Sequence, residues 1–226
     1  MRELEPALRS GLADLALVLD DGQIALLLDY LALIQKWTQV YNLTAVRDPA
    51  EMLTHHLLDS LAVINPLRRQ LAGLRDQAAA AAVNVAKLRL LDVGSGGGLP
   101  GVVIAICCPE IAVDCVDTVA KKVAFIRQVA ATLRLANLRG LHARVESLTD
   151  PYRVICSRAF ASLADFTRLS SAALAPQGLW LAMKAKDTAD EVAALPTTVN
   201  VFHVEQLVVP GLDADRCIVW MRQSAQ

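Results

Sequence analysis

Hydrophobic side chains recur with a helical period in the first part of the chain. Over residues 24–41 they are spaced three or four positions apart, which is typical of the buried face of a helix. The positions are Ile24, Leu27, Leu28, Leu31, Ile34, Trp37 and Tyr41. A second amphipathic segment, 3–19, is interrupted at Gly11, and residues 48–51 resemble a capping box that begins a further helix. We therefore expect residues 1–66 to form a helical extension, with both aromatic side chains of the repeat in its core.

From residue 88 onward, short apolar runs alternate with amphipathic ones. Strands are predicted near 88–93, 111–117, 138–143, 152–157, 178–184, 199–209 and 216–222. Helices are predicted near 100–107, 119–134, 162–174 and 187–194. Repeated β-α-β order predicts an α/β fold with a mainly parallel sheet, and the turn at 209–212 favours an antiparallel C-terminal hairpin. We expect one compact domain over 88–226, joined to the extension by an alanine-rich linker or short surface helices, 67–87.

The first of these strands runs into a glycine-rich loop. Five of the eight residues from Gly94 to Gly101 are glycine, and an apolar helix follows, with Pro100 suited to its first turn. A strand, a glycine turn and a helix form the unit that binds nucleotide-like ligands in open α/β sheets. Glycine lets the backbone approach the ligand, and the helix N-terminus presents free N–H groups to it. The loop therefore predicts a ligand of this kind.

Two spacings overlap in this loop. Gly96, Gly98 and Gly101 satisfy G-x-G-x-x-G, which is typical of dinucleotide sites. Read from Asp92, the loop also satisfies D-x-G-x-G-x-G, with Gly94 as its first glycine, the spacing of S-adenosyl-L-methionine (AdoMet) sites. An acid at the strand tip is unfavourable beside a pyrophosphate but suits the ammonium group of a methionine moiety. The residues favour AdoMet, with the acid and the glycines of the second spacing as contacts; a purely structural turn is the alternative.

Candidate binding residues follow at the ends of the next strands, where ligands bind in this architecture. Asp117 ends the second strand, where a carboxylate can accept hydrogen bonds from ribose hydroxyls, although it also suits a helix cap. Glu146 lies in a turn after the third strand, where a carboxylate can meet the adenine edge. Arg158 ends the fourth strand, beside the position of the transferable methyl group in methyltransferases of this architecture. Lys184 adds a cation at the end of the fifth strand.

Missing motifs narrow the chemistry. No N-P-P-Y or D-P-P-Y sequence follows the fourth strand, as methylation of an exocyclic amino group would require, and no Pro-Cys pair offers a nucleophile. Guanine N7 needs neither a base nor a covalent intermediate, because its lone pair is free. Catalysis on such a target would rest mainly on positioning.

Composition and charge bear on location and partner. The chain has 226 residues, 54% of them hydrophobic, and charged or amide residues interrupt each apolar run before it reaches membrane-spanning length. No signal peptide is evident, and the five cysteines show no C-x-x-C spacing, so we expect a cytoplasmic protein without a metal site or membrane contact. Residues 61–186 hold sixteen Lys and Arg against eight Asp and Glu. This excess of positive charge could form a basic face that binds a polyanion such as a nucleic acid. It is equally consistent with an ordinary solvated surface.

Taken together, these residues resemble the bacterial 16S ribosomal RNA guanine-N7 methyltransferase family, also called glucose-inhibited division protein B. The similarity extends from about Leu27 to Arg222. The matching segments are Trp37 with 41–46, then 56–61, 92–94, 99–101, 157–159 and 183–184. The H-x-x-D-S segment and the Leu-Pro-Gly exit from the glycine loop are specific to this family, because generic methyltransferases lack both.

The resemblance implies a Rossmann-like class I AdoMet-dependent methyltransferase sheet, with AdoMet as cofactor and an RNA substrate. Positions that contact AdoMet in the family correspond to Gly94, Leu99, Val145, Glu146 and Arg158, with Asp117 at the ribose. Arg158 and Lys184 are the implied catalytic residues, and His56, Lys184 and Arg216 the implied RNA contacts. The chain departs from the family pattern at Thr38, Gly97, Val145, Arg153 and Ala185. Of these, Ala185 bears directly on the role of Lys184, because it replaces the glycine that usually follows.

The sequence thus predicts methyl transfer from AdoMet to N7 of a guanosine in 16S ribosomal RNA of the small ribosomal subunit. A non-catalytic rRNA-binding assembly factor and a nicotinamide-dependent oxidoreductase are the alternatives. Whether the substrate is naked RNA or an assembled particle, and whether the protein forms oligomers, are questions that the sequence leaves open.

Overall fold

The computed structural model describes residues 1–80, 88–185 and 188–224, with side chains omitted for 75–80. Before the sheet come η1 (Arg2–Leu4), α1 (Glu5–Asp14), α2 (Asp21–Tyr41), α3 (Pro49–Met52), the π-helical segment η2 (Leu53–Leu58), α4 (Asp59–Leu61) and α5 (Ile64–Ala80). The strands are β1 (Arg89–Val93), β2 (Ala112–Asp117), β3 (Leu138–His142), β4 (Tyr152–Arg158), β5 (Leu174–Lys184), β6 (Val199–Leu207) and β7 (Arg216–Gln223). Between them lie α6 (Gly101–Cys107), α7 (Ala120–Thr132), η3 (Val145–Ser147), α8 (Leu163–Ser170), η4 (Ser171–Ala173) and α9 (Ala189–Ala193).

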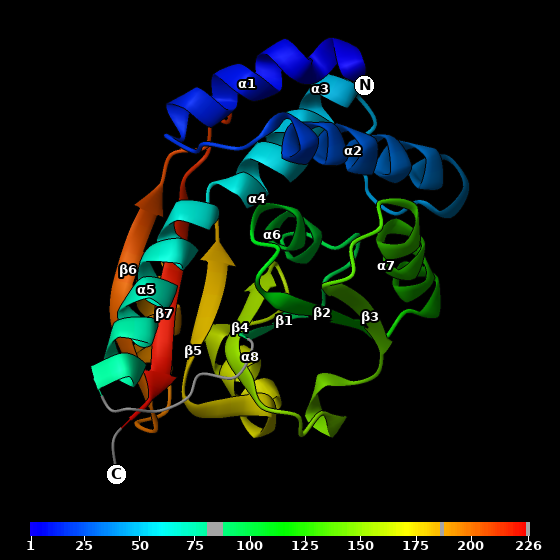
Figure 1. The fold of residues 1–226 in the computed structure, drawn as a ribbon. Helices are drawn as coiled ribbons and strands as arrows, with labels where there is room; N and C mark the ends of the chain where they lie inside the picture. The colour runs from blue at the N-terminus through cyan, green and yellow to red at the C-terminus, as the bar shows by residue number, and fades with distance from the viewer. Residues whose placement is uncertain (81–87, 186–187, 225–226) are drawn as a thin grey trace.

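The strands form one sheet in the order β3-β2-β1-β4-β5-β7-β6. The pairs β3–β2, β2–β1, β1–β4 and β4–β5 are parallel, whereas β7 is antiparallel to both β5 and β6. The predicted mainly parallel sheet with an antiparallel C-terminal hairpin is therefore confirmed. Because parallel strands end on one side, the carboxyl ends of β1, β2, β4 and β5 share one edge, and the N-terminal helices lie over that edge in Figure 1.

Each face of the sheet has its own hydrophobic core. Leu90 and Leu91 of β1 point to opposite faces, because successive side chains of a strand alternate, and they belong to different buried clusters. Helices α1, α2, α5, α6 and α7 contribute to the cluster of Leu90, whereas α8 packs on the side of Leu91. In the described ranges, no helix combines the length and apolar character needed to cross a membrane.

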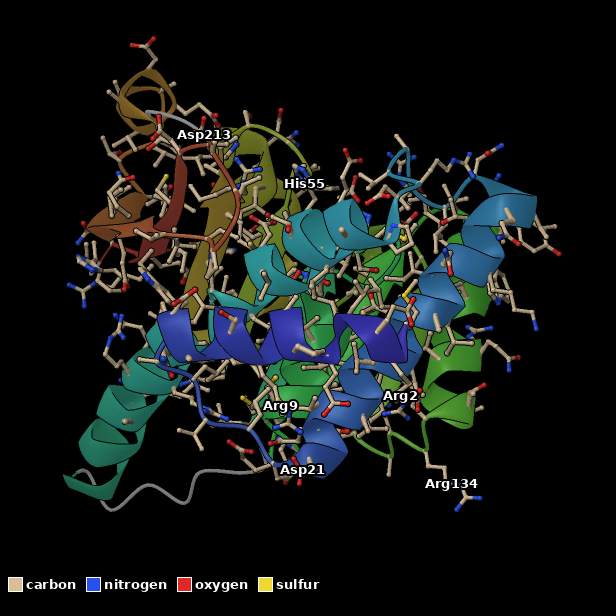
Figure 2. All side chains as sticks on the ribbon, turned by 90° about the horizontal axis from the view of Figure 1, so that it is seen from above. Arg2, Arg9, Asp21, His55, Arg134 and Asp213 are labelled. Carbon is tan, nitrogen blue, oxygen red and sulfur yellow. The ribbon has the colours of Figure 1, made fainter. Side chains whose placement is uncertain are left out.

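The N-terminal helices contact each other closely. Figure 2 shows Arg9 of α1 directed toward Asp21 at the start of α2, and the two side chains form an ion pair at 2.7 Å. The sequence predicted an interruption at Gly11, but this residue lies inside α1 and is buried. A Cβ atom at Gly11 would lie 2.5 Å from a methyl carbon of Leu58, so glycine lets the Leu58 side chain of η2 pack closely against α1. The prediction of a break at Gly11 was wrong for this reason.

Two further expectations differ from the structure. Most of the stretch predicted as a linker or short surface helices belongs to one long helix, α5, in which Leu67 and Leu71 are buried one turn apart. Its alanine-rich composition obscured this helical spacing, and residues 81–87 of the prediction lie outside the described residues. Tyr41 was expected in the core, but it is 45% exposed at the end of α2, where its ring packs on Trp37 with a centroid distance of 5.0 Å.

Candidate active site

The glycine loop turns over the end of the neighbouring strand. The N–H of Gly94 donates to the carbonyl oxygen of Val116 in β2, at 2.9 Å. Gly94, Gly96 and Gly98 have φ angles of 65°, 57° and 88°, a left-handed conformation that side chains disfavour. At Gly94 a Cβ atom would also lie 2.4 Å from the ring of Phe160. The path of the loop therefore depends on glycine at these positions.

A cavity of about 620 Å³ opens beside this loop, within the range of roughly 300–1,000 Å³ typical of small-molecule sites. Its wall combines the loop, the ends of β4 and β5, the start of β7 and the N-terminal extension. The residues predicted for the site that line it are His56, Gly94, Gly96, Leu99, Arg158, Lys184 and Arg216. The structure thus brings the predicted cofactor loop and the predicted RNA-binding side chains to one cavity.

Five predicted cofactor contacts do not line this cavity: Asp92, Gly98, Asp117, Val145 and Glu146. Asp92 is fully buried beneath the loop, where its Oδ2 accepts a hydrogen bond from the Gly101 N–H at 2.8 Å. Burial raises the pKa of Asp92 to about 7, although this hydrogen bond and the positive charge of Arg158 favour the ionised form. In this structure Asp92 holds the start of α6.

Asp117 at the end of β2 supports the loop from the other side. Its Oδ2 accepts from the Gly96 N–H at 3.0 Å, and its Oδ1 accepts from the Val119 N–H at 2.8 Å, just before α7. The carboxylate therefore binds the glycine loop and the helix start together. Beyond β3, Val145 is buried and Glu146 is exposed, both in η3.

A buried carboxylate joins the two arginines of the cavity. Asp59 Oδ2 accepts from Arg158 Nη1 at 2.6 Å, and Asp59 Oδ1 accepts from Arg216 Nε at 2.9 Å. Arg158 Nη1 also donates to the carbonyl oxygen of His55, at 2.9 Å. Asp59 itself is 2% exposed. The cluster links the N-terminal extension, at α4, to the ends of two strands of the sheet.

Lys184 is held on the opposite side by Glu191. Its Nζ donates to Glu191 Oε2 at 2.8 Å and to the carbonyl oxygen of Ala161 at 2.8 Å. Glu191 Oε2 also accepts from the Leu163 N–H at the start of α8. Burial opposes ionisation of Glu191, but the hydrogen bonds from Lys184 and Leu163 lower its pKa. Lys184 is therefore a paired cation at the cavity wall.

His56 is buried and electrically neutral at pH 7. Its Nε2 lies 2.9 Å from Thr44 Oγ1, and its Nδ1 has no hydrogen-bond partner among the residues that the structure describes. Burial lowers the pKa of His56 to about 4, and the positive charge of Arg158 acts in the same direction. The imidazole can exchange hydrogen bonds with a ligand, but it supplies no positive charge for a phosphate near neutral pH.

Two carboxylates that line the cavity, Asp59 and Glu191, were absent from the predicted site residues. Asp59 makes its contacts with residues distant in the chain, and Glu191 pairs with Lys184 of another element, so no spacing within one element marks either of them. For Asp59, the H-x-x-D-S segment was the available signal. No group of three or more His, Cys, Asp and Glu side chains suited to a metal ion occurs in the part of the chain that the structure describes.

The residues present fit AdoMet, the ligand that the loop motif implies. A Cβ atom at Gly96 would meet only the carbonyl oxygen of Gly94, at 4.0 Å, so the loop presents its backbone to open space. The same cavity holds the guanidinium of Arg158 and the buried imidazole of His56. Backbone, a cation and a neutral polar group are the contacts that a nucleoside joined to an amino acid requires.

Comparisons with known proteins identify the family of the chain. Residues 23–219 match the family described as rRNA small subunit methyltransferase G, or GidB. A protein of Albidiferax ferrireducens named ribosomal RNA small subunit methyltransferase G is 88% identical over 225 residues, covering 100% of each chain. A protein of the same name from a Polaromonas species is 66% identical over 222 residues, covering 98% of this chain and 95% of the relative.

Among solved structures, TrmN from Thermus thermophilus matches with a TM-score of 0.50 and 19% identity, covering 61% of this chain and 44% of that one. At this identity the match shows the fold alone. The family model matches most of the chain, and the Albidiferax and Polaromonas relatives are highly similar over nearly their full length. The chain belongs to the rRNA small subunit methyltransferase G family.

Proposed function

We propose that the protein transfers the methyl group of AdoMet to N7 of a guanosine in 16S ribosomal RNA of the small ribosomal subunit, in the cytoplasm. The observation that carries the proposal is the single cavity that joins the glycine loop to Arg158, Lys184 and Arg216. A cofactor on the loop and a nucleotide bound by these cations would share one space. The names of the relatives support an RNA of the small subunit as the partner.

Bound AdoMet supplies a methyl group on a positively charged sulfur atom. The chain contributes binding and orientation: Gly94, Gly96 and Leu99 form the floor on which the cofactor would lie, and Asp117 fixes that floor through the Gly96 N–H. Guanine N7 carries a free lone pair, so no residue has to remove a proton before it reacts. Positioning of two reactants in one cavity is itself a large source of rate.

The substrate side of the cavity is positively charged. Guanidinium groups donate in a fixed geometry to phosphate oxygens and to O6 of guanine, contacts that leave the N7 lone pair free to react. We assign Arg158 and Lys184 to the reaction, and His56, Lys184 and Arg216 to the RNA. We keep Val145 and Glu146, in the turn after β3, as the contacts for adenine. Asp92 and Gly98, which the sequence assigned to the cofactor, we now propose as supports of the loop.

We also propose that the chain divides into an N-terminal extension over 1–66, a connecting stretch over 67–87, most of which belongs to α5, and a cofactor-binding domain over 88–226. The extension takes part in the site, because Thr44, His56 and Asp59 line the cavity.

The test is an assay of purified protein with labelled AdoMet, using small subunits and free 16S RNA from cells that lack the modification. We expect N7-methylguanosine in a nuclease digest of at least one substrate, and its absence from both would overturn the proposal. Arg158→Ala and Lys184→Ala should lose methylation while RNA binding persists. Wild-type protein that binds the RNA without modifying it would instead indicate an assembly factor. Calorimetry should show binding of S-adenosylhomocysteine but not of NAD.

A further inference from the structure

We propose that Asp59 is a positioning residue that holds Arg158 and Arg216 together as one unit facing the nucleotide that receives the methyl group. The inference rests on the proposed function for the identity of that nucleotide. The arrangement of the three side chains stands independently of it. Asp59 touches neither reactant in this assignment and acts through the two guanidinium groups.

The carboxylate of Asp59 binds both arginines. Each oxygen of Asp59 accepts from a different guanidinium, Oδ2 from Arg158 and Oδ1 from Arg216, at 2.6 and 2.9 Å. All three residues line the cavity. They come from α4, the end of β4 and the start of β7, so no two of them are held together by their own chain segment. Removal of Asp59 therefore takes one hydrogen-bond acceptor from each guanidinium group at once, and each keeps one backbone acceptor, the carbonyl oxygen of His55 for Arg158 and that of Asp215 for Arg216.

The backbone beside Asp59 fixes the direction of Arg158. Arg158 Nη1 donates to the carbonyl oxygen of His55 as well as to Asp59, and both acceptors belong to one helical segment. This segment includes the π-helical turn η2, which ends directly before Asp59. π-helical turns are rare and occur frequently at functional sites. Two acceptors on one guanidinium nitrogen set an orientation, whereas a single ion pair would set only a distance.

Charge gives the second reason for a carboxylate at this point. Arginine keeps its charge at every accessible pH, so Arg158 and Arg216 would repel each other beside a cavity if no anion lay between them. Asp59 neutralises one of the two charges and leaves the cluster with one net positive charge. One such charge, with guanidinium donors in fixed directions, suits the acceptor oxygens of a single guanosine nucleotide, either a phosphate or O6.

The chain contains a matched control for this arrangement. Asp114 in β2 is also buried, and it also binds two arginines, Arg89 at 3.0 Å and Arg139 at 2.6 Å. None of these three residues lines the cavity. Loss of the Asp114 carboxylate removes the same kind of buried double ion pair without touching the site. Effects of Asp59 that exceed those of Asp114 therefore report on the cavity.

The experiment compares Asp59→Asn, Asp59→Glu and Asp114→Asn with the wild-type chain. Denaturant unfolding, kcat, KM for small subunits and ¹⁵N spectra of the arginine side chains are measured. For Asp59→Asn we expect kcat to fall at least about tenfold, because misplaced groups at a reaction site commonly reduce rates by this much or more. KM for subunits should not rise, because the cluster gains positive charge. The spectra should show that rotation of the Arg158 and Arg216 guanidinium groups is less hindered than in wild type. Asp59→Glu, which keeps the charge, should lie between Asp59→Asn and wild type, and Asp114→Asn should lose stability but keep kcat per folded molecule.

A folded Asp59→Asn with the kcat of wild type, or with unchanged Arg158 and Arg216 signals, would overturn the inference. A loss of kcat no larger than that of Asp114→Asn would overturn it too. If Asp59→Asn does not fold, Asp59→Glu decides: shifted arginine signals with reduced kcat support positioning, and wild-type values refute it. The spectra need no substrate. Wild-type protein that transfers no methyl group would therefore overturn the proposed function, while the arginine signals still decide the role of Asp59.

Discussion

Lys184 Nζ lies 2.8 Å from Glu191 Oε2, so the cation at the end of β5 is paired with a carboxylate of α9. The ammonium group is also bound by the carbonyl oxygen of Ala161, and the same carboxylate binds the N–H of Leu163. Glu191 thus connects the start of α8, the end of β5 and α9 at one wall of the cavity. The strength with which Lys184 attracts an anionic substrate depends on this partner.

Glu191→Gln should strengthen the attraction of the site for RNA. The change removes one negative charge beside Lys184 and keeps the shape of the side chain. We expect the salt dependence of RNA binding to steepen by about one ion, because one more cation becomes available to a phosphate. Stability should fall by only about 0.5 kcal/mol, since the pair is partly exposed. Binding titrations over a range of salt concentrations measure the slope. Asp190→Asn, which removes the same charge from the exposed neighbouring position, serves as control, and equal slopes for both variants would contradict the prediction.

Gly94→Ala should weaken cofactor binding, whereas Gly97→Ala should not. At Gly94 the left-handed conformation costs an alanine about 1–2 kcal/mol, and the Cβ atom would collide with Phe160, 2.4 Å away. At Gly97 a Cβ atom would lie 3.5 Å from Leu43, an ordinary contact. Calorimetric titration with S-adenosylhomocysteine and urea unfolding of both variants provide the comparison. Equal affinities in the two variants would show that the loop tolerates a side chain where it turns over β2.

Sequence reasoning found the elements that local spacing specifies. The order of strands and helices followed from apolar periodicity, and the glycine loop with Arg158 at the end of β4 followed from the topology that this order implies. The length of α5 was missed because composition was weighed above spacing: Leu67 and Leu71 already lie one helical turn apart. The exposure of Tyr41 was missed because apolar spacing identifies the buried face of a helix but not how far along the helix the rest of the protein covers that face.

The side-chain network of the site was less accessible to sequence reasoning. Asp59 meets Arg158 and Arg216 across chain separations of 99 and 157 residues, so only the fold brings them together. The place of Asp92 follows from strand alternation, which puts it on the same face as Leu90, under α6. The sequence interpretation assigned Asp92 to the ligand because it considered only that Asp92 lies near the end of β1. It did not consider the face of the sheet on which the side chain lies.

The neutral state of His56 should depend on Arg158. Burial lowers the pKa of His56 to about 4, with the charge of Arg158 as the next cause. We expect the His56 ring to show no titration between pH 8 and about pH 5.5 in NMR spectra, and Arg158→Gln to raise its pKa by removing the nearby positive charge. Arg134→Gln, which alters an exposed arginine, should leave the His56 titration unchanged. A midpoint near 6.5 in wild-type protein, or the same midpoint in both variants, would contradict the assignment.

Asp92 should make the protein less stable as the pH rises. Its pKa is about 7 in the folded protein, above the ordinary value of 3.8. Between these two values the folded state holds a proton that the unfolded state has released, so the contribution of Asp92 to the free energy of unfolding falls as pH rises through this window. At pH 8 the carboxylate is ionised and fully buried, which costs up to roughly 4 kcal/mol relative to pH 4.

Asp92→Asn isolates this effect, because the amide oxygen can still accept from the Gly101 N–H but the side chain cannot ionise. Urea unfolding of both proteins at pH 5 and pH 8 gives four free energies. The pH dependence of His56 has the opposite sign, with stability lost as pH falls from 6.5 toward 4, and it cancels in the difference between the two proteins. Relative to Asp92→Asn, wild type should lose a few kcal/mol between pH 5 and pH 8. Parallel pH profiles would show that Asp92 is ionised throughout and that its burial under the loop is compensated. A wild-type free energy of unfolding that rises with pH relative to Asp92→Asn would contradict the raised pKa of Asp92.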